Sequence, residues 1–199
     1  MTLQQEIFRA IASHKKGWVF SACDLTDKFT KKQVNKALYC LLKSGKIRRI
    51  ARGMYDFPRQ SRLFDELRNP SMDKIIAAYA RRDKLTLEVF GETALNYFHL
   101  STQIPAKNIF MSSGKSRTYT LFNGVEIEFR NATPRDIGFK YKMSSIVVRA
   151  LKTLGKRHIN DEVIQRIRER IAPNMRSKIL DDTKGTTPFV YEAIKQICA

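Results

Sequence analysis

Residues 21–58 read SACDLTDKFTKKQVNKALYCLLKSGKIRRIARGMYDFP, and the organisation of the N-terminal part follows from this segment. Two helices are predicted in it, because good N-cap residues precede runs of helical periodicity. The first runs from Ser21 to about Lys28, and the second runs over Lys31–Lys43. The alternating basic segment that follows, residues 46–57, predicts a β-hairpin.

The turn of this hairpin is predicted at Arg52 and Gly53, because glycine permits a positive φ. A further helix is predicted over residues 2–14, and residues 18–20 predict a short buried strand. The order of helix, strand, two helices and basic hairpin is that of a winged helix-turn-helix, here over residues 1–60. Such a fold places one helix in the major groove of DNA, so the order predicts a DNA-binding domain.

The predicted helix over Lys31–Lys43 has two chemically different faces. Lysines, an asparagine and a tyrosine share one stripe at helical spacing, and apolar residues share the other. Asparagine can bond adenine in a bidentate manner, lysine can reach guanine or phosphate, and tyrosine can bond phosphate. A solvated charged face is the alternative interpretation. The DNA contacts predicted on this helix and its cap are Thr30, Lys31, Lys32, Asn35, Lys36, Tyr39 and Lys43.

Three arginines of the hairpin, Arg48, Arg49 and Arg52, complete the predicted set of DNA contacts. An arginine at the tip can enter the minor groove, whose negative potential attracts it. The net charge is +18, and residues 1–60 alone hold 13 Lys and Arg against 4 Asp and Glu. Basic side chains release counterions from phosphates, so this charge favours a polyanionic partner. Charge alone is also compatible with a soluble basic protein that binds no nucleic acid.

Composition limits the class of protein. The hydrophobic fraction of 43% is typical of a globular chain, and the sequence has no apolar run of about 18 residues that would predict a membrane span. The N-terminus lacks the apolar core of a secretory signal, so a cytoplasmic protein is expected. Free, buried thiols are predicted for Cys23, Cys40 and Cys198. Metal-ligand spacing is absent, so no metal and no cofactor are expected for these cysteines or for His14, His99 and His158.

Residues 70–199 predict a second, α+β domain with a small sheet and a helical C-terminal tail. The dipeptide Asn123-Gly124 favours a hairpin turn between two predicted strands, and residues 59–70 predict a linker or a short helix. Helices are predicted over 71–82, 93–100, 144–154, 160–171 and 187–198. A second candidate basic patch would contact phosphate or an acidic partner, or be a solvated face, and it consists of Arg149, Lys152, Lys156 and Arg157.

One group of side chains is reminiscent of metal-dependent nucleases of the restriction-endonuclease-like fold. Glu126 and Glu128 share one face of a predicted strand, and Asp136 and Lys140 follow. In such enzymes, carboxylates and a lysine hold Mg²⁺ and an attacking water. Arg130 stands where a lysine would complete the pattern. Solvated carboxylates are therefore the preferred interpretation, and no catalytic residue is expected.

Three segments, in this order, resemble the AbiEi family of antitoxins: GKIRRIARGMYDFPR (45–59), GETALNYFHLSTQIPAK (91–107) and FNGVEIEFRNATPR (122–135). The resemblance covers roughly residues 1–155. It implies a bacterial type IV toxin–antitoxin system, a kind of system often tied to abortive phage infection. In that family a winged helix represses the operon's own promoter at inverted repeats. The C-terminal domain counters a nucleotidyltransferase toxin, commonly without a stable complex.

These observations together predict a DNA-binding autorepressor and antitoxin that acts in phage defence and is not an enzyme. Carried over by position, its DNA contacts would lie on the Lys32–Lys43 face and on the Arg48–Arg52 hairpin. Two other functions remain open. One is a metal-dependent DNA nuclease targeted by a winged helix, and the other is a transcription factor whose C-terminal domain senses a ligand.

Overall fold

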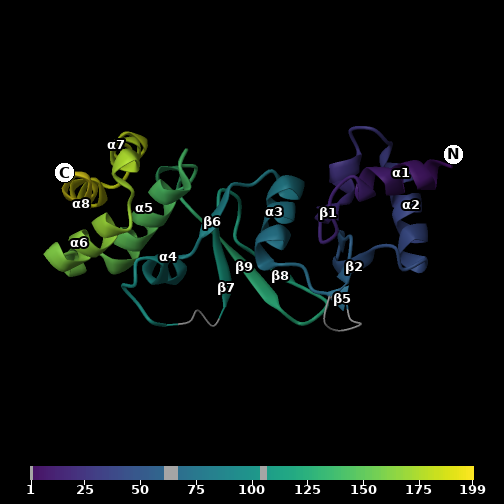
Figure 1. The fold of residues 1–199 in the computed structure, drawn as a ribbon, viewed down its shortest axis with the longest axis horizontal. Coiled ribbons are helices and arrows are strands. Elements are labelled where there is room, and N and C mark those ends of the chain that lie inside the picture. The colour runs from purple at the N-terminus through teal and green to yellow at the C-terminus, as the bar shows by residue number, and fades with distance from the viewer. Residues whose placement is uncertain (1, 61–66, 104–106) are drawn as a thin grey trace. The chain divides into compact units, whose positions relative to one another are not determined.

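The computed structural model describes residues 2–60, 67–103 and 107–199. The fold is mixed α+β, as predicted, and the chain divides into two compact units (Figure 1). The first unit consists of Met1–Leu85 with Tyr119–Val125, and the second consists of Thr86–Thr118 with Glu126–Ala199. Each unit is described separately below.

The first unit begins with two of the predicted helices and the predicted hairpin. The helix predicted over Lys31–Lys43 has the same bounds in the structure. The elements of this unit are α1 (Leu3–Ala12), β1 (Val19–Ser21), the 3-10 helix η1 (Ala22–Leu25), α2 (Lys31–Lys43), β2 (Arg48–Ala51), β3 (Met54–Asp56), β4 (Arg59–Gln60), β5 (Leu67–Arg68) and α3 (Met72–Asp83).

Two predictions in this region are wrong. The helix expected from Ser21 to Lys28 is the single 3-10 turn η1, because its hydrogen bonds close locally around Asp24. The Asp24 carboxylate accepts from the Ser21 backbone at 2.8 Å, and the Thr26 N–H donates to the Cys23 carbonyl three residues earlier. Residues 59–70, expected to be a linker or a short helix, contain the paired strands β4 and β5 at their two ends, and residues 61–66 lie outside the described part of the chain.

Three short antiparallel strands form the sheet of this unit, in the order β1-β3-β2. β3 is central, so β2 is an edge strand. Between the pairs Arg49–Tyr55 and Ala51–Met54, the register of β2 shifts and leaves Ile50 as a bulge. The bulged residue does not pair with β3, and its carbonyl therefore remains available on the outer edge of the hairpin.

The core of the first unit lies between the helices and this sheet. In Figure 1, α1 (purple) lies across one end of α2 (blue). The cluster between them is fully apolar, which fits the helical periodicity of both segments. Its buried side chains are Ile7, Ile11, Phe20, Leu25, Val34, Ala37, Leu38, Leu41 and Ile47.

Helix α3 belongs to the first unit, which is therefore larger than the predicted 1–60 domain. The Arg81 guanidinium bonds the Asp24 carboxylate at 2.6 Å and the Val19 carbonyl at 2.8 Å. On the same helix, Tyr79 is buried, and burial raises the pKa of its hydroxyl to about 12. These contacts fix α3 against β1 and η1.

The second unit contains a group of helices and most of a four-stranded sheet with the order β6-β7-β9-β8, of which the residues Tyr119 and Thr120 of β8 belong to the first unit. β7 pairs antiparallel with β6 and parallel with β9. The elements are β6 (Leu87–Val89), α4 (Gly91–Tyr97), β7 (Asn108–Ser112), β8 (Arg117–Thr120), β9 (Glu126–Asn131), the 3-10 helices η2 (Pro134–Asp136) and η3 (Lys156–His158), α5 (Lys142–Leu154), α6 (Asp161–Glu169), α7 (Pro173–Asp182) and α8 (Pro188–Cys198).

Helices α5 to α8, green to yellow in Figure 1, share one cluster of buried apolar side chains. The tight crossing of α4 and α5 requires Gly91, because a Cβ at that position would overlap the Thr153 side chain. The sequence does not predict α7, since Ile179 is its only fully buried apolar residue and its periodicity is weak. None of the described helices has the length and apolarity required to cross a membrane.

Candidate nucleic-acid interface

Helix α2 begins at a complete capping box. The Thr30 hydroxyl accepts from the Gln33 backbone, and the Gln33 side chain accepts from the Thr30 backbone at 2.9 Å. The first turn of α2 contains no acidic residue, so Lys31 and Lys32 lie beside the positive end of the helix dipole. This end of the helix is therefore strongly electropositive. Thr30, one of the predicted DNA contacts, uses its hydroxyl in the cap.

The two faces of α2 separate as the sequence predicts. Its apolar face is buried in the core of the first unit, whereas the opposite stripe is exposed. Tyr39 is 58% exposed, and the Lys43 ammonium lies 4.9 Å from the centre of its ring. The exposed stripe consists of Lys32, Asn35, Lys36, Tyr39 and Lys43.

The hairpin of β2 and β3 presents Arg52 at its tip. Arg52 is exposed, and the adjacent Gly53 adopts a φ of 73°, which the turn requires and which side chains other than glycine rarely adopt. The hairpin therefore has the expected turn, with a free arginine beside it. Arg49, on β2, is also exposed.

Arg48 has a different environment from the other two arginines. Its Nε and one terminal nitrogen donate to the Asp56 carboxylate at 3.0 and 2.7 Å, and the same guanidinium bonds the Arg68 carbonyl at 2.8 Å. Asp56 is only 1% exposed, and its hydrogen bond raises the pKa of Arg48. Arg48 therefore fastens the hairpin to β5, and we remove it from the set of candidate DNA contacts.

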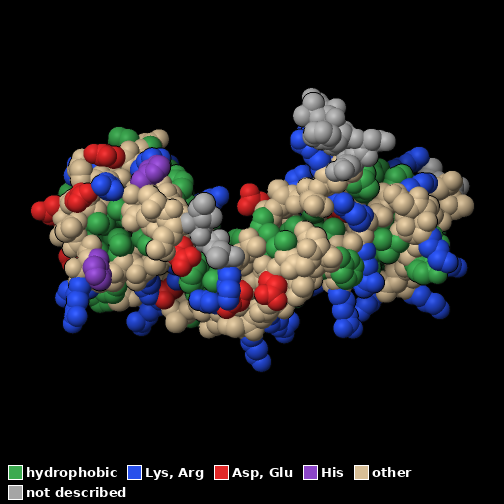
Figure 2. All heavy atoms as spheres, turned by 90° about the horizontal axis from the view of Figure 1, so that it is seen from below, with side chains coloured by type: hydrophobic (Ala, Val, Ile, Leu, Met, Phe, Trp, Pro, Cys, Tyr) green, Lys and Arg blue, Asp and Glu red, His purple; other side chains and the backbone are tan. Residues whose placement is uncertain are grey.

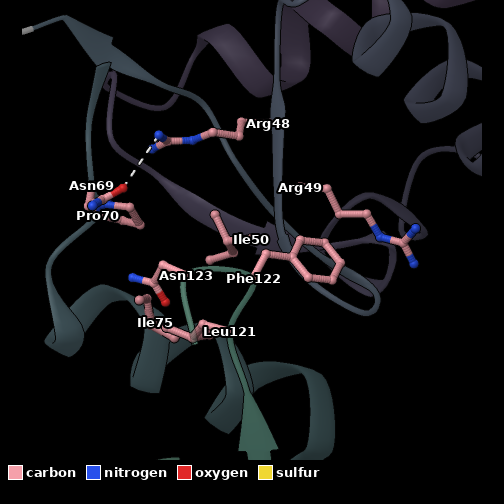
Figure 3. A pocket seen from close by; sticks show the side chains of 9 residues that line it. All are labelled: Arg48, Arg49, Ile50, Asn69, Pro70, Ile75, Leu121, Phe122 and Asn123. Carbon is pink, nitrogen blue, oxygen red and sulfur yellow. Dashed lines mark hydrogen bonds between the residues drawn. The ribbon is translucent and has the colours of Figure 1, made fainter. Parts of the chain in front are cut away.

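A turn from a distant part of the chain lies against the outer edge of β2. The backbone N–H of Phe122 donates to the carbonyl of the bulged residue Ile50 at 2.8 Å. In Figure 3 the Phe122 ring lies beside Arg49, whose guanidinium carbon is 5.7 Å from the ring centre. The turn and the hairpin enclose a pocket of about 200 Å³, with Ile50, Ile75 and Leu121 among its apolar lining. The sequence does not predict this arrangement.

The charges around these elements are mostly positive. Figure 2 shows blue Lys and Arg side chains projecting from the first unit, on the right of the view, with few red side chains among them. Two of the acidic residues in this unit, Asp24 and Asp56, are already bound by Arg81 and Arg48. The basic charge of the exposed stripe and the hairpin tip is therefore little compensated nearby.

The second candidate basic patch is not a continuous surface. Arg149 is only 8% exposed, donates to the Asp136 carbonyl at 3.0 Å and has its pKa lowered by burial. Lys152 forms an ion pair with the Asp136 carboxylate. Burial is the largest single influence on the pKa of Asp136 and raises it, but hydrogen bonds from Lys152 and Thr133, together with the charges of Lys152 and Arg149, lower that pKa below its ordinary value. These two basic residues therefore hold η2 against α5, and only Lys156 and Arg157 of the patch are exposed.

Two acidic residues of the nuclease hypothesis, Glu128 and Asp136, are engaged in other contacts, whereas Glu126 is exposed. Glu128 bonds Arg130 at 2.7 Å, and this hydrogen bond lowers the pKa of Glu128. Asp136 is held by Lys152, as described above. Lys140 donates its backbone N–H to Asp182 at 3.0 Å. Within residues 2–60, 67–103 and 107–199, no three His, Cys, Asp or Glu side chains gather in a group that could hold a metal ion.

The three cysteines are free thiols, as expected, but the prediction that they are buried is wrong. Cys23 is exposed, and Cys40 and Cys198 are half-buried. Cys23 is exposed because it lies on η1, which is one turn long and turns only Leu25 into the core. Burial raises the pKa of the Cys198 thiol.

One protein-family model matches the chain. It is described as "Family of unknown function (DUF6088)", and it matches residues 6–179, which include both units. No curated protein matches the chain.

Substitution of Arg48 by alanine is expected to destabilise the first unit by about 1–3 kcal/mol, because the buried carboxylate of Asp56 loses its guanidinium partner. Urea unfolding followed by circular dichroism measures the change. Arg52→Ala is the matched control, since it removes the same charge at an exposed position and should change the free energy of unfolding by about 0.5 kcal/mol or less. Equal stabilities of the two variants would contradict the assignment of Arg48.

Proposed function

Since the chain belongs to the DUF6088 family, for which no function is known, we propose its function from the geometry of the first unit. We propose that α1, η1, α2 and the β2–β3 hairpin form a winged helix-turn-helix that binds double-stranded DNA and regulates transcription. The exposed stripe of α2 is the observation that carries this proposal. Five polar or basic side chains lie on one side of a helix whose other side is fixed in a core.

The dimensions and chemistry of α2 suit a major groove. A helix of 13 residues is about 20 Å long, and a major groove about 12 Å wide admits it. Asn35, near the middle of the exposed stripe, has the donor and acceptor pair that reads adenine. Lys32 and Lys36 flank it and can reach guanine or phosphates. Tyr39 with Lys43 above its ring would contact the sugar-phosphate backbone.

The hairpin supplies the second part of the proposed interface. Arg52 at its tip would enter the minor groove beside the helix, where a narrow groove concentrates negative potential. Arg49, on the same hairpin, would neutralise a phosphate. Arg48 takes no part in this interface, because Asp56 and the Arg68 carbonyl already use its guanidinium.

We extend the proposal to an antitoxin role on the resemblance of three segments to the AbiEi family. The chain would repress its own promoter at inverted repeats through the first unit. It would counter a nucleotidyltransferase toxin through the second unit, without necessarily forming a stable complex. The ion pairs described in the second unit, such as Lys152 with Asp136, identify no residue that neutralises a toxin.

The double variant Lys36→Ala/Arg52→Ala tests the DNA-binding proposal. Its affinity should fall for all duplexes, and the slope of log K against log[salt] should become shallower by about 2, because two positive charges that displace counterions from the duplex are lost. Fluorescence anisotropy with a duplex from directly upstream of its own coding sequence, and with a random-sequence duplex, measures both quantities. Lys178→Ala/Arg170→Ala removes the same charge from exposed positions of the second unit and serves as the control. An unchanged slope in the first variant, or an equal change in the control, would contradict the proposed interface.

Replacement of Asn35 by alanine is expected to relax sequence preference. The preferred duplex, obtained by selection from a randomised pool, should lose about 1–3 kcal/mol of binding free energy, while random duplexes should lose little. Lys36→Ala is the comparison, since a lost phosphate contact weakens all duplexes alike. If Asn35→Ala also weakened all duplexes alike, Asn35 would be a phosphate contact and not a base-reading residue.

Co-expression with a nucleotidyltransferase encoded beside the chain tests the antitoxin role. With both genes under unrelated inducible promoters, the chain should restore growth of the toxin-expressing strain. The Lys36→Ala/Arg52→Ala variant should restore growth equally, because repression is not needed in this arrangement. If the soluble wild-type chain fails to restore growth, the antitoxin role is contradicted. The proposed function is then that of a transcription factor alone.

A further inference from the structure

The turn from Leu121 to Gly124 is held firmly against the hairpin of the first unit. The Gly124 N–H donates to the Leu121 carbonyl at 2.9 Å, and Gly124 adopts a φ of 81°, which a turn of this kind requires. Leu121 is buried, and the nearby Tyr119 hydroxyl donates to Asp83 of α3 at 3.0 Å. The turn is therefore anchored at both its backbone and its flanking side chains.

This turn lies along the free edge of β2, on the side that faces away from β3. Phe122 donates its N–H to Ile50, whose carbonyl is released from the β2–β3 ladder by the bulge. The turn thus occupies the place of a further strand beside β2. Residues remote in the sequence become part of the same surface as Arg49, as Figure 3 shows.

The side chain of Phe122 is exposed to solvent and is not part of the apolar core. It is 65% exposed, the largest exposed fraction among the large apolar side chains of the described residues. Leu121 before it is buried, so the turn itself directs Leu121 inward and Phe122 outward. An exposed phenylalanine gives little stability to its own unit, because its apolar area remains in water.

A basic side chain accompanies the ring of Phe122. The Arg49 guanidinium lies 5.7 Å from its centre, as Lys43 lies 4.9 Å from the centre of the exposed Tyr39 ring. Such a pair presents an apolar face and a cation together, which suits the sugar and the phosphate of one nucleotide. A groove-facing apolar ring beside an arginine can also enter a base step and kink the duplex.

We propose that the Leu121–Gly124 turn is a second DNA-contacting loop beside the hairpin, and that Phe122 is an apolar wedge that enters the minor groove and bends the duplex. This inference rests on the proposed function. Arg49 holds the flanking phosphate, while Phe122 partly unstacks a base step. The wedge contributes affinity and bending, but it neutralises no phosphate.

The test uses the full chain and a selected 30-base-pair duplex that carries a fluorescent donor and acceptor at its ends. Wild-type protein should shorten the end-to-end distance in a manner consistent with a bend of about 20–90°. Phe122→Ala should abolish most of this change and weaken binding roughly tenfold, with an unchanged slope of log K against log[salt]. Phe122→Leu, which retains an apolar wedge, should preserve most of the bend.

Tyr97→Ala is the matched control, because Tyr97 is an exposed aromatic residue of the second unit, 44% exposed. It should leave both affinity and bend unchanged. Thermal unfolding of Phe122→Ala should match that of the wild type, since the ring is mostly in water. A duplex with 2-aminopurine at successive positions reports the unstacked step as a rise in fluorescence, and this rise should vanish in Phe122→Ala.

The outcomes separate this inference from the function on which it rests. If the Lys36→Ala/Arg52→Ala variant loses affinity while Phe122→Ala keeps both affinity and bend within twofold, the wedge is refuted and the DNA-binding proposal stands. If Phe122→Ala leaves DNA binding unchanged but removes growth rescue in co-expression, the exposed ring serves a protein partner and the wedge is likewise refuted. If the wild-type chain binds no duplex at any salt concentration, both proposals fail together.

Discussion

The packing of α2 against α1 and Phe20 is the contact on which the rest of the first unit depends. Val34, Leu38 and Leu41 are almost completely buried in this cluster, and burial of side chains of this size stabilises a fold by about 1.5–3 kcal/mol each. Because the apolar face of α2 is fixed inward, its opposite face has to be exposed. The position of Asn35 and Tyr39 on the surface is thus a consequence of core packing and requires no specific interaction of their own.

The β2–β3 hairpin is joined to other segments at both ends. Near its base, Arg48 joins the buried Asp56 to the backbone at Arg68. Near its tip, the bulge at Ile50 accepts the turn that carries Phe122. Hydrogen bonds from the Arg48 guanidinium to the Arg68 carbonyl and from the Phe122 N–H to the Ile50 carbonyl therefore join the hairpin to segments outside the sheet. A strand at the edge of a sheet is commonly covered in this way, because its free backbone groups would otherwise pair with another chain.

The distribution of charge differs between the two units. In the first unit, the bound acids Asp24 and Asp56 leave the stripe of α2 and the tip of the hairpin positive. In the second unit, Arg149 and Lys152 are directed toward Asp136, and Arg130 is directed toward Glu128. A count of basic residues treats all of these alike, whereas the structure separates cations that are free to meet phosphate from cations that hold the fold together.

The sequence by itself determined the helix over Lys31–Lys43, its two faces and the turn at Gly53, because periodicity, capping and glycine conformation are local properties. It overestimated the helix after Ser21, since local hydrogen bonds around Asp24 end that turn early. Only the tertiary structure decided that Arg48 and Arg149 bond within the fold and that Phe122 lies beside Arg49. Each of these depends on a partner 8 or more residues away in the chain, and neither composition nor spacing specifies which remote carboxylate, carbonyl or ring a side chain will meet.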